Sequence, residues 1–200
     1  IITEEFMQRL IKLEKMCHHF HLSLQSGCDE TLKRMNRKYN TAEIKEIVER
    51  LRRYYNDVIL TTDIIVGFPG ETEEDFNDTL DVVNTCKYDG AFTFIYSPRE
   101  NTPAAKMKND LTEAEKEERL HRLNELVNKY SKESNERMLN TIQKVLVTGV
   151  SEKDSNKVCG YTENMKLVNV TAPMDTIGQI INVKITDAKS FSLDGEIIEN

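Results

Sequence analysis

Residues 61–72 read TTDIIVGFPGET, and this stretch decides which fold the chain adopts. The sequence predicts a strand over residues 58–68, because Ile64-Ile65-Val66 is a continuous apolar run typical of a parallel strand covered on both faces. Thr72 followed three residues later by Asp75 predicts the capped start of a helix. The stretch therefore predicts a strand, a tight turn and a helix, the repeating unit of an α/β protein.

The turn between this strand and helix is suited to a ligand. Gly67 and Gly70 carry no side chains, so the backbone can approach a bound group closely. The free N–H groups of the following helix form a weak anion site, but Glu71, Glu73 and Glu74 disfavour phosphate there. A nucleoside fits this turn better than a triphosphate, and the alternative is a tight βα turn without a ligand.

Outward from this stretch, strands and helices alternate. The predicted strands cover residues 21–25, 58–68 and 91–96, and the predicted helices run from Thr3 to Cys17 and begin at Asp29, Asn40, Thr72 and Thr112, the last ending near Asn140. This order predicts a parallel sheet or barrel, with functional groups on the loops that follow the strands. We expect the loops 25–29, 67–73 and 97–105 to meet at one rim.

The pattern changes after the long helix. Short strands are predicted at residues 145–147, 157–162, 167–170, 178–185 and 192–198, separated by Gly, Asn, Asp and Pro. Five short strands in so few residues favour a small closed antiparallel barrel. We therefore predict two domains, residues 1–140, which include a connector helix over about 112–140, and residues 141–200.

Composition narrows the classes of protein. The chain has 200 residues, 38% hydrophobic, without an apolar stretch long enough to span a membrane or the layout of a secretory signal, so we expect a cytoplasmic protein. Its net charge of −7 argues against a surface that attracts phosphates throughout. The densest basic group is Lys33, Arg34, Arg37 and Lys38, which is either a local nucleic-acid contact or a solvated helix surface.

The cysteines do not form a metal motif. Cys17, Cys28, Cys86 and Cys159 lie far apart and no CxxC or CxxxCxxC pattern occurs, so local spacing provides neither a zinc nor an iron–sulfur site. We expect free thiols. His18, His19 and His21 have no carboxylate or cysteine in register, and we predict no metal site.

Several motifs carry a resemblance to a known family. They are Leu24-Gln25-Ser26-Gly27, the run from Asp63 to Phe76, the run from Phe92 to Arg99, and Thr102-Pro103-Ala104. Together they resemble the methylthiotransferase branch of the radical-SAM superfamily, of the MiaB type. The resemblance implies that residues 1–140 are the C-terminal part of a partial parallel β/α barrel, similar to a TIM barrel.

The resemblance also implies S-adenosylmethionine as a cofactor. The residues that match the binding positions of the family are Gln25, Ser26, Ile65, Gly67 and Arg99. Arg99 is suited to a carboxylate or phosphate of cofactor or substrate, and the alternative is a surface ion pair with Glu100. No residue of this chain is predicted to be catalytic.

The chain departs from the family pattern in small ways and in a large one. Ser23, Cys28 and the pair Glu100-Asn101 replace the residues usual in relatives, which affects the expected loop shapes. The larger departure is that the cysteines of the family's two 4Fe-4S clusters have no counterpart here. We therefore expect a fragment that is inactive alone, with the cluster ligands in the full-length protein.

The last region resembles a TRAM domain, a small OB-like, RNA-binding β-barrel, over residues 143–196. The resemblance implies RNA contacts by Asn164, Lys166 and Phe191. Charge adds little, because the chain from Thr141 onward has six Lys, no Arg and eight Asp or Glu. The alternative is that Tyr161 and Phe191 belong to the core of the barrel.

The resemblance implies an activity and its partners. The full-length protein would add a methylthio group to C2 of an N6-prenylated adenosine. Its expected partners are the tRNA anticodon loop and an electron donor, and we expect it to bind neither a membrane nor DNA. Within the family, the alternatives are a threonylcarbamoyl-adenosine in tRNA and an aspartate of a ribosomal protein. Outside it, they are a non-catalytic RNA-binding module and a self-contained phosphate-binding β/α enzyme.

Overall fold

A computed structural model describes residues 2–198, which form two compact units. The first unit comprises the described residues up to 14, residues 20–56 and residues 60–128. The second comprises residues 15–19 and 57–59 and the described residues from 129 onward.

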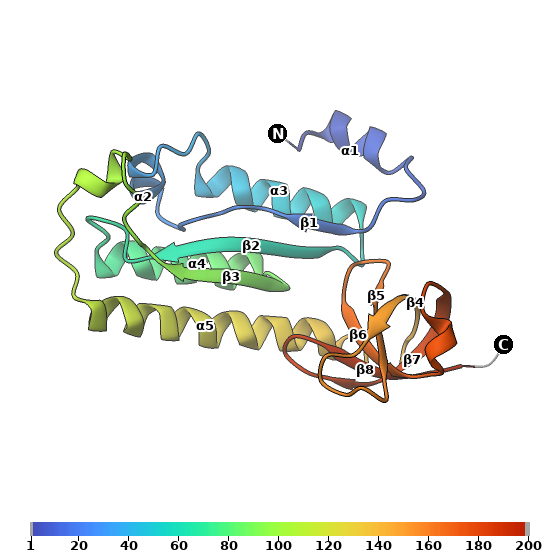
Figure 1. The fold of residues 1–200 in the computed structure, drawn as a ribbon. Coiled ribbons are helices and arrows are strands. Elements are labelled where there is room, and N and C mark those ends of the chain that lie inside the picture. Colours follow the sequence, from blue (N-terminus) through green and yellow to red (C-terminus); the bar gives the residue numbers. More distant parts are fainter. Residues whose placement is uncertain (1, 199–200) are drawn as a thin grey trace. The chain divides into compact units, whose positions relative to one another are not determined.

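A parallel sheet forms the centre of the first unit. Its strands are β1 (His19–His21), β2 (Ile59–Val66) and β3 (Gly90–Ile95), in the order β1-β2-β3. Strands β2 and β3 are parallel, with Thr61 opposite Gly90 and Val66 opposite Ile95. The intervening helices are α3 (Thr41–Tyr54) and α4 (Glu73–Cys86), so the predicted alternation of strand and helix is confirmed (Figure 1).

The two faces of the sheet differ. Along β2, Leu60, Thr62, Ile64 and Val66 are fully buried, whereas the residues between them are only partly buried. Because successive strand residues point to opposite faces, one face of β2 is packed and the other is open. The open face comprises Thr61, Asp63, Ile65, Phe92 and Phe94, and the residues of β3 belong to it because they are register partners of β2.

The helices begin where the capping residues place them. Asn40 and Glu43 form a reciprocal capping box at α3, and Thr72 and Asp75 form one at α4. The remaining helices are α1 (Glu4–Leu10), α2 (Asp29–Arg34) and α5 (Glu113–Glu136), with 3-10 turns η1 (Ala104–Lys106) and η2 (Met174–Thr176). Helix α5 starts after Thr112 as predicted and ends a few residues before the expected Asn140.

Three expected boundaries were wrong. Helix α1 ends at Leu10 rather than Cys17, and the next apolar residue of that series, Leu13, is 58% exposed and lacks the packing that would extend the helix. Cys28, not Asp29, is the N-cap of α2. The first strand ends at His21, and the predicted continuation is a single bridge from Gln25, whose φ of 69° interrupts the extended backbone.

A closed five-stranded β-barrel forms most of the second unit. Its strands are β4 (Ile142–Val150), β5 (Val158–Thr162), β6 (Leu167–Thr171), β7 (Ile180–Ala188) and β8 (Leu193–Ile197), in the order β4-β5-β6-β8-β7. Strands β6 and β8 are parallel and the other pairs are antiparallel, so the barrel is mixed rather than purely antiparallel. The strand count and the closure agree with the prediction.

Apolar side chains fill the barrel. Its core comprises Met138, Val145, Val147, Val158, Val168, Val170, Ile181, Val183, Ile185 and Leu193. Gly160 lets β4 approach closely, because a Cβ at this position would lie 2.1 Å from the carbonyl oxygen of Leu146. Across the described residues, no helix has both the length and the apolar content needed to cross a membrane.

Candidate functional site

The three predicted loops begin at one end of the sheet, which we call the rim. The N–H of Gln25 donates to the carbonyl of Asp63 at 2.8 Å, and the N–H of Ile65 donates to the carbonyl of Gln25 at 2.9 Å. The N–H of Tyr96 donates to the carbonyl of Val66 at 2.8 Å. The segments after β1, β2 and β3 are therefore joined at the carboxyl end of β2, as parallel strands require.

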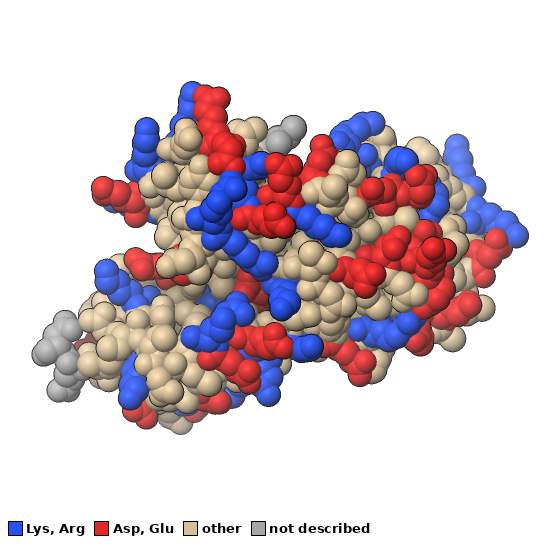
Figure 2. Space-filling view, turned by 180° about the vertical axis from the view of Figure 1, so that it is seen from behind, with Lys and Arg blue, Asp and Glu red and all other residues tan. Residues whose placement is uncertain are grey.

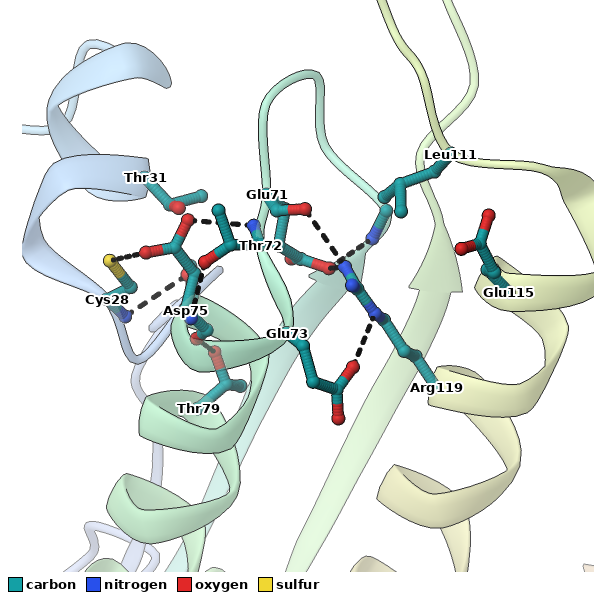
Figure 3. Close-up of polar contacts among 12 residues, drawn as sticks. Cys28, Thr31, Glu71, Thr72, Glu73, Asp75, Thr79, Leu111, Glu115 and Arg119 are labelled. Atoms are coloured by element: carbon teal, nitrogen blue, oxygen red, sulfur yellow. Dashed lines mark hydrogen bonds and ion pairs between the residues drawn. The ribbon is translucent and has the colours of Figure 1, made fainter.

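A buried ion pair holds the turn after β2. One carboxylate oxygen of Glu71 accepts from the N–H of Gly67 at 2.9 Å and from the Arg119 guanidinium at 2.7 Å (Figure 3). The same guanidinium donates to the Glu71 carbonyl at 3.1 Å. Burial raises the pKa of Glu71, and the hydrogen bonds from Gly67 and Arg119 offset this only in part. The ion pair connects the turn to helix α5.

The sequence did not reveal this contact. The sequence places Glu71 among three acidic residues that disfavour phosphate, but its carboxylate lies inside the turn and bonds to the turn's own backbone. The spacing of Gly67 and Glu71 was the available signal, since a carboxylate four residues beyond a glycine can reach the glycine's N–H. Arg119 is 48 residues away in the chain and had no such signal.

A second polar cluster fixes the loop after β1. The Asp75 carboxylate accepts from the Cys28 thiol at 3.0 Å and from the N–H of Thr72 at 3.0 Å (Figure 3). It also accepts from the Arg34 guanidinium at 3.2 Å. Burial raises the pKa of Asp75, but these hydrogen bonds outweigh it and leave the pKa below its ordinary value. Asp75, which belongs to the capping box of α4, therefore also fixes α2 through its bonds to Cys28 and Arg34.

Gly27 brings the same loop against α4. Its N–H donates to the Thr79 hydroxyl at 2.9 Å, and a Cβ at Gly27 would lie 2.4 Å from the Cα of Thr79. No side chain fits there without moving the backbone, so glycine is required at this position.

The predicted cofactor-binding residues differ in accessibility. Gln25 and Ser26 are buried, and the Ser26 hydroxyl accepts from the N–H of Cys28 at 3.2 Å. Gly67 is covered by the side chain of Lys116, whose Cγ would be 2.7 Å from a Cβ at Gly67. Ile65 is half-buried on the open face, and Arg99 is exposed on the loop after β3. Among the described residues, no ion pair joins Arg99 to Glu100.

A cavity lies at the end of β3. Its volume is about 470 Å³, and its lining residues are Pro69, Ile95, Tyr96, Ser97, Pro98, Ala104, Ala105, Met107, Asn109, Glu113 and Lys116. Asn109 donates to the carbonyl of Gly67 at 3.0 Å, which links this loop to the turn after β2. The Tyr96 hydroxyl is buried with no hydrogen-bond partner. The rim thus combines rigid turns with space for part of a small molecule.

The described residues do not gather into a metal site. No cluster of three or more His, Cys, Asp or Glu side chains occurs in the part of the chain that the structure describes. All four cysteines are free, and burial raises the pKa of both Cys28 and Cys86. His21 bonds instead to Thr61 and Asp63 at 3.1 Å each.

The basic group near α2 is mostly paired. Lys33 forms an ion pair with Glu30 at 2.5 Å, and Arg34 forms one with Asp75 at 3.2 Å. Lys38 donates to the Asn36 side chain at 2.9 Å. Figure 2 shows Lys and Arg interspersed with Asp and Glu on the face that it displays. These observations favour the solvated helix surface over a local nucleic-acid contact.

The predicted RNA-binding residues lie on two loops of the barrel. Phe191, between β7 and β8, is 72% exposed, whereas Asn164 and Lys166, between β5 and β6, are largely buried. The Asn164 amide accepts from the Thr162 hydroxyl at 2.6 Å and donates to the carbonyl of Asp57, also in the second unit, at 3.0 Å. Tyr161 is 38% exposed, so the alternative that Tyr161 and Phe191 form the barrel core was wrong.

Two family models match parts of the chain. Residues 1–83 match the Radical SAM superfamily, and residues 136–198 match the TRAM domain. Among solved structures, a radical SAM enzyme from Escherichia coli, coproporphyrinogen III oxidase (HemN), has a TM-score of 0.49 and 15% identity, over 73% of this chain and 41% of that one.

Curated relatives match nearly the whole chain. A tRNA-2-methylthio-N(6)-dimethylallyladenosine synthase of Alkaliphilus oremlandii is 49% identical over 99% of this chain and 42% of its own length. Proteins with the same name from Bacillus cytotoxicus and Clostridium tetani are 47% and 46% identical over 98% of this chain, and 38% and 43% of their own lengths. The chain thus spans about two fifths of these relatives. With its α/β rim and closed barrel, the chain therefore carries a part that matches the Radical SAM superfamily and a TRAM domain, and over nearly its whole length it is similar to these synthases.

Proposed function

We propose that the protein of which this chain is a part adds a methylthio group to C2 of an N6-prenylated adenosine in tRNA, in the cytoplasm. The observation that carries the proposal is the 49% identity to a synthase named for this product, which extends over both the rim and the barrel. We take residues 1–140 as the C-terminal part of the radical SAM barrel, with the connector helix over about 112–140, and residues 141–200 as the TRAM domain.

S-adenosylmethionine is the cofactor that the superfamily implies, and the rim fits it in part. Ile65 offers an apolar, half-buried side chain for an adenine, and Arg99 offers an exposed guanidinium for a carboxylate. Gln25, Ser26 and Gly67 are covered and would act by shaping the backbone around the bound group. When bound, S-adenosylmethionine supplies the methyl group and the precursor of the adenosyl radical. The residues of this chain orient it and exclude water.

Iron–sulfur clusters do not fit the residues of this chain. Thiolate ligands must gather around the iron atoms, and the four cysteines are free with no metal-binding group among the described residues. We propose that two 4Fe-4S clusters are held by the portion that the relatives have in addition to the part matched here, and that an electron donor reduces a cluster. No step of the chemistry is assigned to a residue of this chain.

The TRAM barrel is proposed to bind the anticodon loop of the tRNA. Phe191 is the best placed of the predicted residues, because an exposed aromatic ring can stack on an unpaired base. Asn164 and Lys166 would contribute through the shape of the β5–β6 loop or after rearrangement, since both are largely buried. The proposal includes no DNA and no membrane partner.

The test is to produce the protein at the full length of its relatives and to analyse tRNA after the reaction. The protein, with S-adenosylmethionine and a reductant, should convert prenylated adenosine to its 2-methylthio derivative, detected by mass spectrometry of nucleosides. An Arg99→Ala variant should bind S-adenosylmethionine more weakly, while Arg53→Ala, which removes an exposed arginine of α3, should bind it normally. Methylthiolation only of threonylcarbamoyl-adenosine, or only of a ribosomal-protein aspartate, would contradict the proposal.

A further inference from the structure

The open face of the sheet presents two exposed aromatic rings. Phe92 and Phe94 are 62% and 51% exposed, and both belong to β3 with one residue between them. Their register partners on β2 are Asp63 and Ile65, which therefore point to the same face. Adjacent large apolar side chains that remain exposed on a sheet face indicate a surface that something else covers.

The polar groups beside these rings are already paired with each other. His21 bonds through Nε2 to Asp63 at 3.1 Å and through Nδ1 to the Thr61 hydroxyl at 3.1 Å. Its ring lies 6.2 Å from that of Phe92. Both ring nitrogens of His21 are thus occupied, and the side chains of His21 and Asp63 are only 36% and 31% exposed. His21 therefore packs beside the Phe92 ring and does not offer a free hydrogen-bonding group to a ligand on this face.

The charge of the face excludes one class of ligand. No Lys or Arg occurs in β1, β2 or β3, all of which are described, and Asp63 is the single carboxylate in these strands. A ligand carboxylate that binds against Phe92 and Phe94 would lose its hydrating water without forming an ion pair with a Lys or Arg of these strands. A neutral hydrocarbon group loses nothing by the same transfer and gains apolar contact.

We propose that Phe92 and Phe94 are specificity-determining residues that contact the N6 substituent of the target adenosine and select a neutral hydrocarbon group. The inference rests on the proposed function and deepens it. A prenyl group is a branched hydrocarbon that fits a pair of phenyl rings. The threonylcarbamoyl group and an aspartate side chain, the substrates of the alternative activities, both carry a carboxylate that this face does not neutralise.

The experiment uses the full-length protein with its cofactors and an equal mixture of tRNA bearing prenylated and unmodified adenosine at the target position. The ratio of the two methylthiolated products measures the preference. Phe92→Ala and Phe94→Ala should each lower this ratio by about 10-fold to 100-fold, the range that a lost hydrophobic contact produces. Phe92→Leu, which keeps an apolar side chain, should retain most of the preference.

Phe6→Ala is the matched control, because Phe6 is also an exposed phenylalanine, 44% accessible, but lies on α1 outside the open face. This variant should show the wild-type product ratio. A second measurement avoids turnover: equilibrium dialysis with N6-prenyl-adenosine and adenosine should show that wild-type protein prefers the prenylated nucleoside and that Phe92→Ala has lost most of this preference.

The outcomes separate this inference from the proposed function. If the wild-type protein methylthiolates no prenylated tRNA, the proposed function fails. Suppose instead that the wild-type protein is active, and that both alanine variants are less stable to heat and form both products more slowly by the same factor. If the product ratio and the nucleoside preference are then unchanged, the rings are packed against other strands of the barrel and the inference is overturned. An unchanged nucleoside preference in a stable Phe92→Ala variant overturns it as well.

Discussion

The turn after β2 and the β-barrel are stabilised by different kinds of buried groups. In the turn, the charged side chains of Glu71 and Arg119 are 1% and 6% exposed and bond to each other. In the barrel core, the buried residues are Val, Ile, Leu and one Met, and Val183, Ile185 and Leu193 are fully buried. The barrel therefore owes its stability to apolar area, and the turn owes its shape to directed contacts.

This difference follows from what each region must do. A barrel closes when alternate residues of each strand are apolar, and many combinations of Val, Ile and Leu satisfy that requirement. A loop at a ligand-binding rim must take one backbone conformation, and directed hydrogen bonds such as that from Gly67 to Glu71 select it. Mutations should therefore affect the two regions with different dependence on pH.

The largest effect is expected at the turn. Arg119→Met leaves the Glu71 carboxylate buried without its cation and should lower the free energy of unfolding by about 3–5 kcal/mol. Burial already raises the pKa of Glu71, so the folded variant favours the protonated form. Its stability should consequently rise as the pH falls from 7 toward the ordinary pKa of glutamate. Urea unfolding at pH 7 and pH 5 measures both quantities.

The matched control for this prediction is the double variant Glu71→Gln, Arg119→Met. It removes both charges, so the loss should be smaller than that of Arg119→Met alone and should not change between these pH values. Equal losses in the single and double variants would show that the ion pair contributes only packing.

The next effect tests the barrel. Ile185→Ala creates a cavity in the core and should cost about 2–5 kcal/mol, because Ile185 is fully buried. The cost should be the same at pH 7 and pH 5, since no ionisable group belongs to this core cluster. The same urea titration checks it. Thr186→Ala, at an exposed position of the same strand, should change stability by less than about 0.5 kcal/mol. A marked pH dependence for Ile185→Ala would weaken the contrast between the two regions.

A smaller effect is expected at the second polar cluster. Asp75→Asn should cost about 1–3 kcal/mol at pH 7, because the carboxylate accepts hydrogen bonds from Cys28, Thr72 and Arg34. The folded pKa of Asp75 is lowered, so the wild type has this stabilisation above the ordinary pKa of aspartate and loses it as the pH falls through the folded value. Wild type and variant should thus converge once the pH falls below the folded pKa of Asp75, which lies below the ordinary value of aspartate. A difference that already shrinks above the ordinary pKa of aspartate would contradict the lowered pKa.

The sequence predicted regular elements well because their signals are local. Short strand-like runs separated by Gly, Asn, Asp and Pro located all five barrel strands, and the run Ile64-Ile65-Val66 located the central strand β2. The parallel pairing of β6 with β8 escaped prediction, since strand direction within a barrel depends on contacts between residues distant in the chain. The early end of α1 escaped as well, because the exposure of Leu13 is a tertiary property.

The candidate site was predicted less completely. The convergence of the loops at one rim followed from parallel strands, and Ile65 and Arg99 are accessible there. The burial of Ser26, and of Gly67 beneath Lys116, depends on how helices pack over the loops, which one sequence does not show. Sequence patterns thus located the rim, but not which of its atoms face a ligand.

The smallest effect is expected at the N-cap of α3, a contact that the sequence predicts and that lies neither in the turn after β2 nor in the barrel core. Asn40 caps α3 by accepting from the N–H of Glu43 at 2.9 Å, and Asn40→Ala should cost about 1 kcal/mol. Asn40→Ser keeps a capping oxygen and should stay close to wild type. Because the cap is exposed, water replaces much of the lost hydrogen bond, which is why the expected cost is below that of the partly buried contacts of Asp75 with Cys28 and Arg34. If Asn40→Ala cost as much as Arg119→Met in urea unfolding, burial would not be what makes the rim contacts strong.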